Sequence, residues 1–341
     1  MTTTVQEFTG DAATWNAYVR GVPGATFCHL AGWHEIMTDV LGHECFPLVA
    51  CDGQGAWNGV LPLVRVRSPL FGHFIVSMPF LNAGGPIGDA DAAGEMLTWS
   101  VAEARRSGAD LLELRSRAPV EGDVRRSNRK ITVHRALPDH PDALWAAFPA
   151  KLRSQIRRPQ KEGFEVKFGA GQREAFYDVF ARDMRSLGTP VLPRALFERV
   201  AAVFPDEAEF GVVYRGEQPI AAGCGFVWRN EFEMVWASSL RVYRRQAPNM
   251  LLYWSFMQRM IERGVRLFDF GRCTAGGNTH AFKRQWGGVD VALPWAQWSR
   301  GDVTATPSPA SPLFRAAAAC WRHLPLSVTK SIGPMIAARI P

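Results

Sequence analysis

Hydrophobic and polar residues alternate with two different periods along the N-terminal part of the chain. A spacing of three to four residues between apolar positions predicts a helix, whereas strict alternation predicts a half-buried strand. The sequence DGQG lies between two alternating runs and predicts a hairpin turn. The expected elements are helices over 11–41, broken at Gly21 to Gly24, and over Ala90–Ser107, with strands over Phe46–Ala50, Gly59–Val66, Phe71–Met78 and Asp110–Arg115.

The same order of patterns returns in the second half of the chain. Helical spacing gives way to alternating strands around the turn sequence GEQP, and a further helix and a last apolar strand follow. Two halves with one order of elements predict an α+β fold built from two copies of the same plan. The expected elements are helices over Arg173–Leu187, Arg194–Phe204 and Asn249–Arg263, with strands over Phe210–Tyr214, Ile220–Trp228, Phe232–Ser238 and Val265–Phe270.

The basic, proline-containing segment Arg117–Gln160 is the predicted join between the two halves. We therefore expect an N-terminal half over residues 1–145 and a C-terminal half over 146–300. Residues 301–341 are expected to form a separate tail.

The tail begins with a Pro/Ser/Thr-rich linker at Thr304–Pro312. The segment Leu313–Pro341 then carries basic residues and no Asp or Glu, and Pro325 and Pro334 are expected to break it into short helices. A basic, apolar helix pair of this kind either docks on the body of the protein or makes peripheral contact with an anionic membrane surface.

Composition adds limits to this picture. The chain has 341 residues, of which 47% are hydrophobic and 21% charged, and this is enough for about two domains. The net charge of +7 favours a polyanionic partner such as a nucleic acid, a phosphate-rich cofactor or an anionic membrane. The six cysteines form no CxxC pair, and the N-terminus lacks a signal-peptide pattern, so we expect a cytoplasmic protein, with the inner face of the membrane as the surface that the tail would reach. No pattern indicates an oligomeric state.

The loop between the strand Phe232–Ser238 and the next helix is suited to binding a phosphate. A helix start offers free backbone N–H groups to an anion, and Arg241, Arg244 and Arg245 lie just before it. Asn249 belongs to the same donor-binding prediction, or it is simply the N-cap of the helix. The arrangement resembles the pyrophosphate loop of the GNAT acyltransferase fold. The sequence RRQAPN contains no glycine, which departs from the usual signature and argues against ordinary coenzyme A binding at this loop.

Further motifs narrow the resemblance to the FemAB-like proteins, and within them to the branch associated with exosortase (PEP-CTERM) and exopolysaccharide loci. The likeness extends over about Ala146 to Pro294 and is weaker over Phe27 to Arg115. The motifs, in chain order, are the basic segment Lys151–Gly163, Leu187-Gly-Thr-Pro190, Asn249 with Tyr253 and Trp254, Phe268-Asp-Phe-Gly-Arg272, and Phe282-Lys-x-x-Trp-Gly287.

This resemblance implies tandem GNAT-like domains, each a mostly antiparallel sheet flanked by helices, and transfer of an acyl or aminoacyl group to an amine. The implied donor is aminoacyl-tRNA or acyl-CoA, with no permanently bound cofactor and no metal. The implied acceptor is a small-molecule or lipid-linked amine on a cell-envelope or exopolysaccharide precursor. Two alternatives remain open: an acetyl-CoA-dependent amino-sugar N-acetyltransferase, and a degenerate GNAT pair that acts only as a binding or assembly factor.

The resemblance also assigns roles to single residues. Lys283 matches the lysine implicated in catalysis, so we assign it to the acyl carbonyl oxygen or to the donor phosphate, and expect Lys283→Ala to lower turnover with little loss of fold. Asp269 is either the catalytic base or the partner of Arg272, and Arg272 is a predicted phosphate or carboxylate ligand. Tyr253, Trp286 and Thr189 are predicted pocket residues, although Trp286 could equally belong to the core.

Two basic clusters complete the prediction. Arg153, Arg157 and Arg158 share most of one helix face, which is either a solvated face or a site for a tRNA acceptor stem or a nucleotide diphosphate. The second cluster reads as an exposed loop and consists of Arg125, Arg126, Arg129, Lys130 and Arg135.

Three other patterns carry little weight. The triplet Asp-Phe-Gly at 269–271 lacks the other kinase motifs. The cysteines and histidines between Cys28 and Cys51 lack the paired spacing of a zinc site. A nucleophilic Cys273 with His280 does not fit a direct transfer, and related proteins more often have serine at that position.

Overall fold

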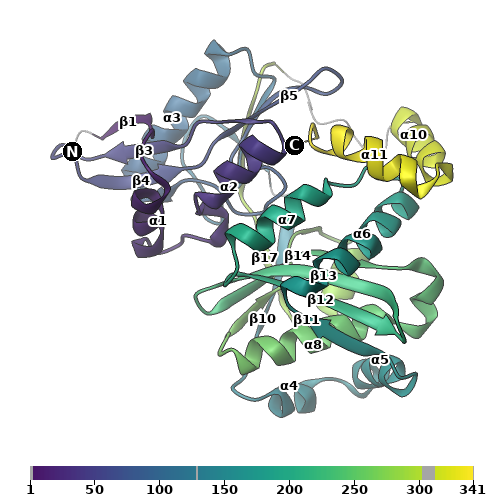
Figure 1. The fold of residues 1–341 in the computed structure, drawn as a ribbon. Coiled ribbons are helices and arrows are strands. Elements are labelled where there is room, and N and C mark those ends of the chain that lie inside the picture. Colours follow the sequence, from purple (N-terminus) through teal and green to yellow (C-terminus); the bar gives the residue numbers. More distant parts are fainter. Residues whose placement is uncertain (1–2, 128–129, 302–311, 341) are drawn as a thin grey trace. The chain divides into compact units, whose positions relative to one another are not determined.

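A computed structural model describes residues 3–127, 130–301 and 312–340 (Figure 1). The described residues form two compact units. The first contains the residues up to Lys130 together with 292–301 and 338–340, and the second contains 131–291 and 312–337. None of the described helices combines the length and the apolar character that a membrane span requires. The predicted linker at Thr304–Pro312 lies outside the described residues, apart from Pro312.

The first unit has two sheets. A four-stranded sheet has the order β1-β3-β4-β7, and a six-stranded sheet has the order β2-β5-β6-β8-β18-β9. The strands are β1 (Thr4–Glu7), β2 (Glu44–Cys45), β3 (Leu48–Cys51), β4 (Trp57–Leu61), β5 (Val64–Ser68), β6 (Gly72–Val76), β7 (Ile87–Gly88), β8 (Leu111–Leu114), β9 (Arg125–Ser127) and β18 (Trp295–Ser299), and the helices are α1 (Ala12–Gly21), η1 (Phe27–His29), α2 (Gly32–Glu35), the π-helix η2 (Ile36–Val40) and α3 (Ala90–Arg106).

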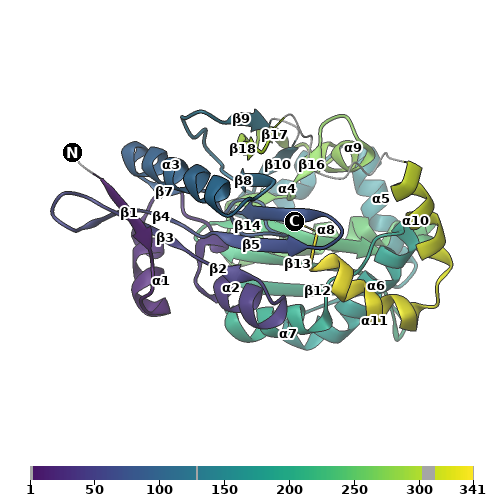
Figure 2. The ribbon, with the colours of Figure 1, turned by 90° about the horizontal axis from the view of Figure 1, so that it is seen from above.

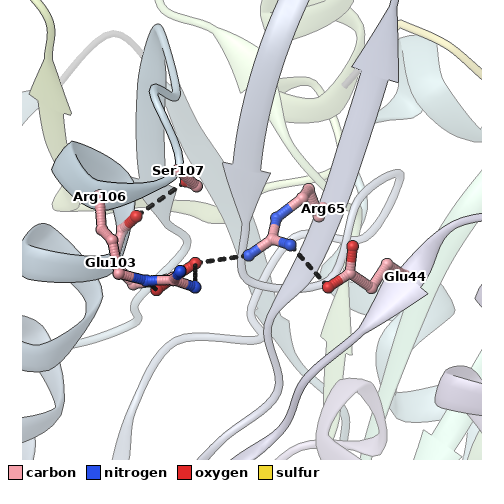
Figure 3. Close-up of polar contacts among 5 residues, drawn as sticks. All are labelled: Glu44, Arg65, Glu103, Arg106 and Ser107. Carbon is pink, nitrogen blue, oxygen red and sulfur yellow. Dashed lines mark hydrogen bonds and ion pairs between the residues drawn. The ribbon is translucent and has the colours of Figure 1, made fainter.

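An ion network fastens helix α3 to the six-stranded sheet of the first unit. The guanidinium of Arg65 on β5 lies between two carboxylates, 2.6 Å from Glu44 of β2 and 2.6 Å from Glu103 of α3 (Figure 3). Arg106 closes the network at 2.7 Å from Glu103. Because Glu103 is 6% exposed, its charge would be costly without these two partners.

The second unit is built on one mixed sheet with the order β11-β12-β13-β14-β15-β10-β16, and β17 pairs with β10. The strands are β10 (Lys130–Ala136), β11 (Glu165–Phe168), β12 (Ala208–Arg215), β13 (Gln218–Trp228), β14 (Glu231–Ser239), β15 (Leu267–Asp269), β16 (Cys273–Thr274) and β17 (Val289–Ala292), and the helices are α4 (Pro141–Ala147), α5 (Ala150–Lys161), η3 (Ala170–Gln172), α6 (Arg173–Leu187), α7 (Arg194–Val203), η4 (Arg241–Gln246), α8 (Pro248–Glu262), α9 (Asn278–Arg284), α10 (Pro312–His323) and α11 (Leu326–Ala337).

The main core of the second unit lies between this sheet and α8. Alternate strand residues such as Val133, Phe232 and Phe268 are fully buried there against Phe256 and Met257 of α8. On the other face, α6 packs on β13 and β14, and Phe197 of α7 meets Trp236 of β14 at 5.2 Å between ring centroids. Figure 1 shows the helices on the two faces of this sheet.

The α+β class is confirmed, and most predicted elements are found with small shifts at their ends. The predicted strand Gly59–Val66 is two strands, since β4 belongs to the four-stranded sheet and β5 to the six-stranded sheet. The boundary between the two compact units, after Lys130, falls within the predicted join Arg117–Gln160. The segment also holds regular structure, namely β9, β10 as an inner strand of the second unit's sheet, α4 and most of α5.

The tail forms two helices, and only one of the two predicted breaks occurs. The chain leaves α10 before Pro325, but Pro334 lies inside α11. A Cβ added to Gly333 would lie 3.1 Å from the backbone nitrogen of Val191, so this part of α11 packs tightly on the rest of the second unit. That packing, together with the position near the helix end, lets α11 continue through the proline.

Candidate functional site

Two neighbouring strands of the second unit diverge in the middle of its sheet. β14 and β15 run parallel and pair only over Glu231–Glu233 and Leu267–Asp269. Beyond these residues β14 continues to Ser239, whereas the chain of β15 bonds to β10 through Phe270 and turns at Gly271, where φ is 72°. Among the described residues, no strand pairs with this side of β14 beyond Glu233. The divergence therefore leaves backbone hydrogen-bonding groups on this side of β14 without a strand partner among the described residues.

A bulge in β14 lies at the same place. Its partner strand β13 pairs Gly225 with Met234 and Cys224 with Trp236, so Val235 is an extra residue. A bulge of this kind reverses the alternation of side chains along the strand. It thus places Met234 in the core with α8 and Trp236 on the opposite face with α7.

Polar side chains gather on one face of the sheet at the point of divergence. Asp269 of β15 pairs directly with His134 of β10 on one side and with Glu233 of β14 on the other. Directly paired residues share a face, and so do residues two apart on one strand, so Thr132 and Glu231 lie on this face as well. We call these five residues, Thr132, His134, Glu231, Glu233 and Asp269, the polar cluster.

Asp269 is buried and is hydrogen-bonded through both of its carboxylate oxygens. It is 2% exposed and accepts hydrogen bonds from the Thr132 hydroxyl and from the Gly271 N–H, the latter at 2.7 Å. Nε2 of His134 lies 3.1 Å from its Oδ2, and the His134 side chain is 18% exposed. An ionised Asp269 favours the imidazole tautomer that carries its hydrogen on Nε2, which leaves Nδ1 as a basic nitrogen. The pair can therefore accept a proton from a ligand.

The polar cluster also contains donor atoms that could hold a cation. One ligand atom each of His134, Glu231 and Asp269 lie within 4.8 Å of one another. Imidazole and carboxylate groups suit a divalent transition-metal ion. To bind one through Nε2, His134 would exchange its hydrogen bond with Asp269 for the ion, so a bound ion and the proton-accepting pair are alternative states of these residues.

Lys283 lies close to this region but is buried. It is 4% exposed, and Nζ donates to the carbonyl oxygens of Gly271 at 2.5 Å and Arg272 at 3.0 Å. Burial lowers the pKa of Lys283 below its ordinary value. The side chain thus fastens the turn after β15, so the expectation that Lys283→Ala leaves the fold almost intact conflicts with its packing.

The segment between β15 and Lys283 is more ordered than its glycines suggest. The predicted extended loop before Phe282 contains β16 and the start of α9, which begins at Asn278. His280 of α9 binds the N–H of Gly276 at 3.0 Å and the carboxylate of Asp290 at 2.9 Å. Arg272 is half-buried at the head of this segment, in the turn that Lys283 holds. Its role as a phosphate or carboxylate ligand stays a prediction.

The start of α8 has the features expected of an anion site. Arg244 and Arg245 are exposed, and no side chain caps the helix. The N-cap residue is Ala247, with φ at 54° in the left-handed region, and Asn249 lies inside the first turn. The alternative that Asn249 is the N-cap was therefore wrong, while its donor-binding role stays a prediction.

The basic helix predicted over Lys151–Gly163 is α5. Leu152 and Ile156 are buried, while Arg157 and Arg158 are exposed and Arg153 is partly exposed. The guanidinium of Arg157 lies 5.1 Å from the ring centroid of Trp145. This face can meet a polyanion, but the polar cluster itself contains none of its arginines.

The second basic cluster is divided among different roles. Arg126 pairs with Glu121 at 2.6 Å, and Arg135 donates to the carbonyl of Gly287 at 2.9 Å. Arg129 lies outside the described residues. Nothing in the described part of the chain brings these arginines to the polar cluster.

The three predicted pocket residues lie in different surroundings. Tyr253 and Trp286 are buried in the main core with ring centroids 6.1 Å apart, and burial raises the pKa of Tyr253. Thr189 is exposed, and its neighbour Gly188 packs on Ala318 of α10. The structure therefore does not bring the three together, and their pocket role stays a prediction.

Comparison with known proteins identifies the fold of the second unit. Residues 147–284 match the family described as Acetyltransferase (GNAT) domain. The second unit has a GNAT acyltransferase fold. No curated protein sequence matches the chain.

Solved structures extend the likeness to both units. The crystal structure of FemX has a TM-score of 0.64 at 13% identity and covers 92% of this chain and 100% of its own. The structure of L-PGS from Bacillus licheniformis has a TM-score of 0.56 at 12% identity, with 92% and 98% covered. A tandem GNAT protein from the clavulanic acid biosynthesis pathway has a TM-score of 0.52 at 13% identity, with 90% and 100% covered. The predicted tandem GNAT-like fold is confirmed.

The GNAT fold was recognisable from the sequence, but four members of the polar cluster were missed. His134 and Thr132 fall in the predicted join, Glu233 falls in the predicted strand Phe232–Ser238, and Glu231 directly precedes that strand. A signal was present, because each pair is two residues apart and alternates with buried apolar residues. Polar residues on one face of an inner strand indicate a site, or a face covered by other polar groups.

Proposed function

We propose that the second unit catalyses the transfer of an acyl or aminoacyl group to an amine, with His134 and Asp269 accepting the proton of the attacking nitrogen. The observation that carries this proposal is the hydrogen-bonded pair His134–Asp269 on two inner strands of the sheet, next to the point where β14 and β15 diverge. An acyl chain that entered between these strands would meet the proton acceptor at the end of the opening.

The proposed reaction needs no covalent intermediate with the protein. The lone pair of the amine attacks the acyl carbonyl carbon, so that a C–N bond forms and the carbonyl oxygen becomes an oxyanion. Nδ1 of His134 takes the proton from the nitrogen, and the buried Asp269 stabilises the imidazolium that results. The C–S or C–O bond to the donor then breaks, and the same proton passes to the leaving thiolate or ribose oxygen.

Backbone groups are suited to stabilising the oxyanion. The side of β14 beyond Glu233 has no partner strand among the described residues, and its bulge at Val235 changes the direction of the N–H groups. Fixed N–H dipoles directed at a developing negative charge lower the barrier without reorganisation. In this proposal Lys283 positions the turn that carries Arg272 and does not itself contact the donor.

The donor would be held through its phosphates. The uncapped start of α8, with Arg244 and Arg245 before it, offers N–H groups and positive charge to a pyrophosphate or to the 3′ end of a tRNA. The arginines of α5 offer a second contact for a long polyanion. Both aminoacyl-tRNA and acyl-CoA fit these features.

The acceptor is proposed as an amine on a cell-envelope or exopolysaccharide precursor. This rests on the FemAB resemblance of the motifs between Lys151 and Gly287, and the association with exosortase systems rests on the same sequence motifs. Neighbouring genes for polysaccharide export would support it.

An acetyl-CoA-dependent N-acetyltransferase is the second candidate, favoured by the match of residues 147–284 to an acetyltransferase family. The third candidate is a catalytically degenerate GNAT pair that acts only as a binding or assembly factor, and it predicts no turnover with either donor.

Turnover and binding with the two donors separate these candidates. Acetyl-CoA and a set of charged tRNAs are each titrated against the protein over a range of salt, and radiolabelled acyl transfer to amine acceptors is measured. Binding of charged tRNA with a steep salt dependence, and none of acetyl-CoA, selects the aminoacyl donor. The double variant Arg244→Gln/Arg245→Gln should weaken donor binding, whereas Arg67→Gln on the first unit serves as the matched control. Absence of transfer with either donor contradicts the enzyme proposal.

A further inference from the structure

The helices α10 and α11 form a hairpin that packs along α6 at the surface of the second unit (Figures 1 and 2). Three polar contacts fasten it to α6. Arg185 donates to the carbonyl of Leu324 at 2.6 Å, Arg322 donates to that of Leu187 at 3.2 Å, and Lys330 pairs with Asp178 at 3.1 Å. The hairpin is therefore a docked part of this unit, which was one of the two sequence interpretations.

One side of α11 is nevertheless apolar and exposed. Thr329, Gly333 and Ala337 are buried, while Val328, Ile332 and Met335 are 37%, 39% and 63% exposed. The exposed three recur at helical spacing and therefore form one row. Large exposed apolar side chains that gather in this way indicate a surface for a partner or a membrane.

The charge of the hairpin has a single sign. Residues 312–340 contain Arg and Lys but no Asp or Glu. Arg315, Arg322 and His323 of α10 are exposed. The carboxylate of Asp178 on α6, which the hairpin contacts, is paired with Arg182 at 2.8 Å and with Lys330. The charged side chains that the hairpin itself contributes are thus all basic.

We propose that the α10–α11 hairpin docks on the surface of an anionic lipid bilayer, with Val328, Ile332 and Met335 among the acyl chains and the arginines at the phosphates. An apolar row beside cations matches the two layers of such a surface, since the headgroups are anionic and the chains beneath are apolar. The proposal holds whatever reaction the second unit catalyses.

Other occupants fit these features less well. The phosphates of a nucleic acid would neutralise the arginines, but the same charged backbone would not bury the three apolar side chains. A second copy that used the same surface would place like charges against each other. An acidic protein with an apolar groove is the remaining alternative, and the experiment separates it from a membrane because vesicles contain no protein.

Vesicle sedimentation of the purified full chain tests the proposal. Vesicles of phosphatidylglycerol and phosphatidylcholine are compared with vesicles of phosphatidylcholine alone, at low and high salt. We expect binding to the anionic vesicles that weakens as salt rises. The variant Ile332→Ser/Met335→Ser should lower the vesicle partition coefficient by about tenfold, as expected for two apolar side chains that no longer leave water. Leu70→Ser is the matched control, because Leu70 is 80% exposed on the first unit.

Each outcome decides the proposal. No binding of the wild type to anionic vesicles overturns it, and so does equal binding to neutral vesicles. Equal binding of wild type and the double variant also overturns it, provided that both melt at the same temperature. If the double variant is unfolded, Arg315→Gln, which leaves the three fastening contacts in place, replaces it and must reduce binding to anionic vesicles, or the proposal fails.

Discussion

Each unit contains a corresponding pair of parallel strands with a buried carboxylate, but the groups that contact this carboxylate differ between the two units. In the first unit β6 pairs with β8 up to Val76 and Glu113, and in the second β14 pairs with β15 up to Glu233 and Asp269. In each case a long helix, α3 or α8, connects the two strands, and a further antiparallel strand follows in the sheet. Glu113 and Asp269 thus occupy equivalent positions.

The groups around the two carboxylates differ. Glu113 is held by the guanidinium of Arg115 at 2.8 Å and by the amide of Gln297 at 2.6 Å, and Gln297 is its direct partner on β18. Asp269 has His134 as its direct partner on β10, and Glu233 in place of Val76 on the parallel strand.

This comparison teaches which of the two sites is suited to chemistry. An arginine and a carboxamide satisfy a buried carboxylate without being able to take up a proton at neutral pH. A histidine in the same position can accept one, and Glu233 adds a second carboxylate on the same face. The first unit therefore uses this position for stability, and we infer that the second uses it for proton transfer.

The largest expected effect is on turnover. His134→Gln keeps a hydrogen-bonding side chain next to Asp269 but removes the basic nitrogen, so kcat/KM should fall about 1,000-fold, equivalent to about 4 kcal/mol. The measurement is acyl transfer with whichever donor supports activity. Gln297→Leu at the equivalent position of the first unit is the control and should leave turnover per folded molecule within about twofold. Equal losses in the two variants would remove the distinction between the sites.

The second effect is on the free energy of unfolding and concerns Glu113, the corresponding buried carboxylate of the first unit. Arg115→Met leaves Glu113 buried with Gln297 alone, and it also removes a donor to the carbonyl of Leu81 at 3.0 Å. The free energy of unfolding should fall by about 3 kcal/mol, measured by urea denaturation. Arg126→Met, which breaks an exposed ion pair, should change it by less than about 1 kcal/mol. A stable Arg115→Met protein would mean that Glu113 does not need the guanidinium.

The third effect is on the pH dependence of stability and concerns His29, a histidine that the first unit buries as a neutral group. His29 accepts the N–H of Thr26 on Nδ1 at 3.0 Å, and its Nε2 lies 2.8 Å from the carbonyl oxygen of Gly85. Burial lowers the pKa of His29 to about 4 from 6.5. The unfolded chain therefore binds this proton first, and stability is lost as the pH falls from 6.5 toward 4, by about 3 kcal/mol in total.

Urea unfolding between pH 7 and 4.5 measures this loss. His29→Gln should make the decline with falling pH shallower, whereas His323→Gln on the exposed end of α10 should follow the wild type. Parallel pH profiles for His29→Gln and wild type would contradict a neutral, buried His29.

The fourth effect concerns the turn next to Asp269. Lys283→Met keeps the length of the side chain but removes the donor to the carbonyls of Gly271 and Arg272, so the free energy of unfolding should fall by about 2 kcal/mol. Turnover should fall as well, because the turn carries Arg272. Lys161→Met at the exposed end of α5 is the control. Lost turnover with unchanged stability would instead support direct contact of Lys283 with the donor.

The smallest effect is expected at the start of α8. Ala247 has a left-handed φ of 54°, which glycine adopts at lower cost, so Ala247→Gly should raise the free energy of unfolding by about 0.5 kcal/mol. Ala201→Gly inside α7 should lower it by about 1 kcal/mol. Thermal melts of the two variants give the signs, and a loss of stability in Ala247→Gly would show that its methyl group contributes packing.

Local structure was largely predictable from the sequence because it depends on neighbours along the chain. The apolar spacing over Arg173–Leu187 predicted α6 with the correct bounds, and the turn sequence DGQG predicted the β3–β4 hairpin. The same spacing predicted α8 and the strands on either side of it, and hence the loop with Arg244 and Arg245.

Strand neighbours were not predictable in this way. His134 and Asp269 are 135 residues apart in sequence, and Gln297 reaches Glu113 across 184 residues. β18 lies in the predicted C-terminal half but completes a sheet of the first unit. Pairing over such distances depends on sheet order, which apolar periodicity does not contain.

By itself the sequence determined the periods of the helices and strands, the single sign of charge in the tail, and the presence of Asp269 and Lys283 after an apolar strand. Only the tertiary structure decided that Asp269 faces His134, that Lys283 points inward to two carbonyls, and that Val328, Ile332 and Met335 remain exposed. The physical reason is that a side chain's chemistry depends on its burial and its partners, and both are set by the packing of distant segments.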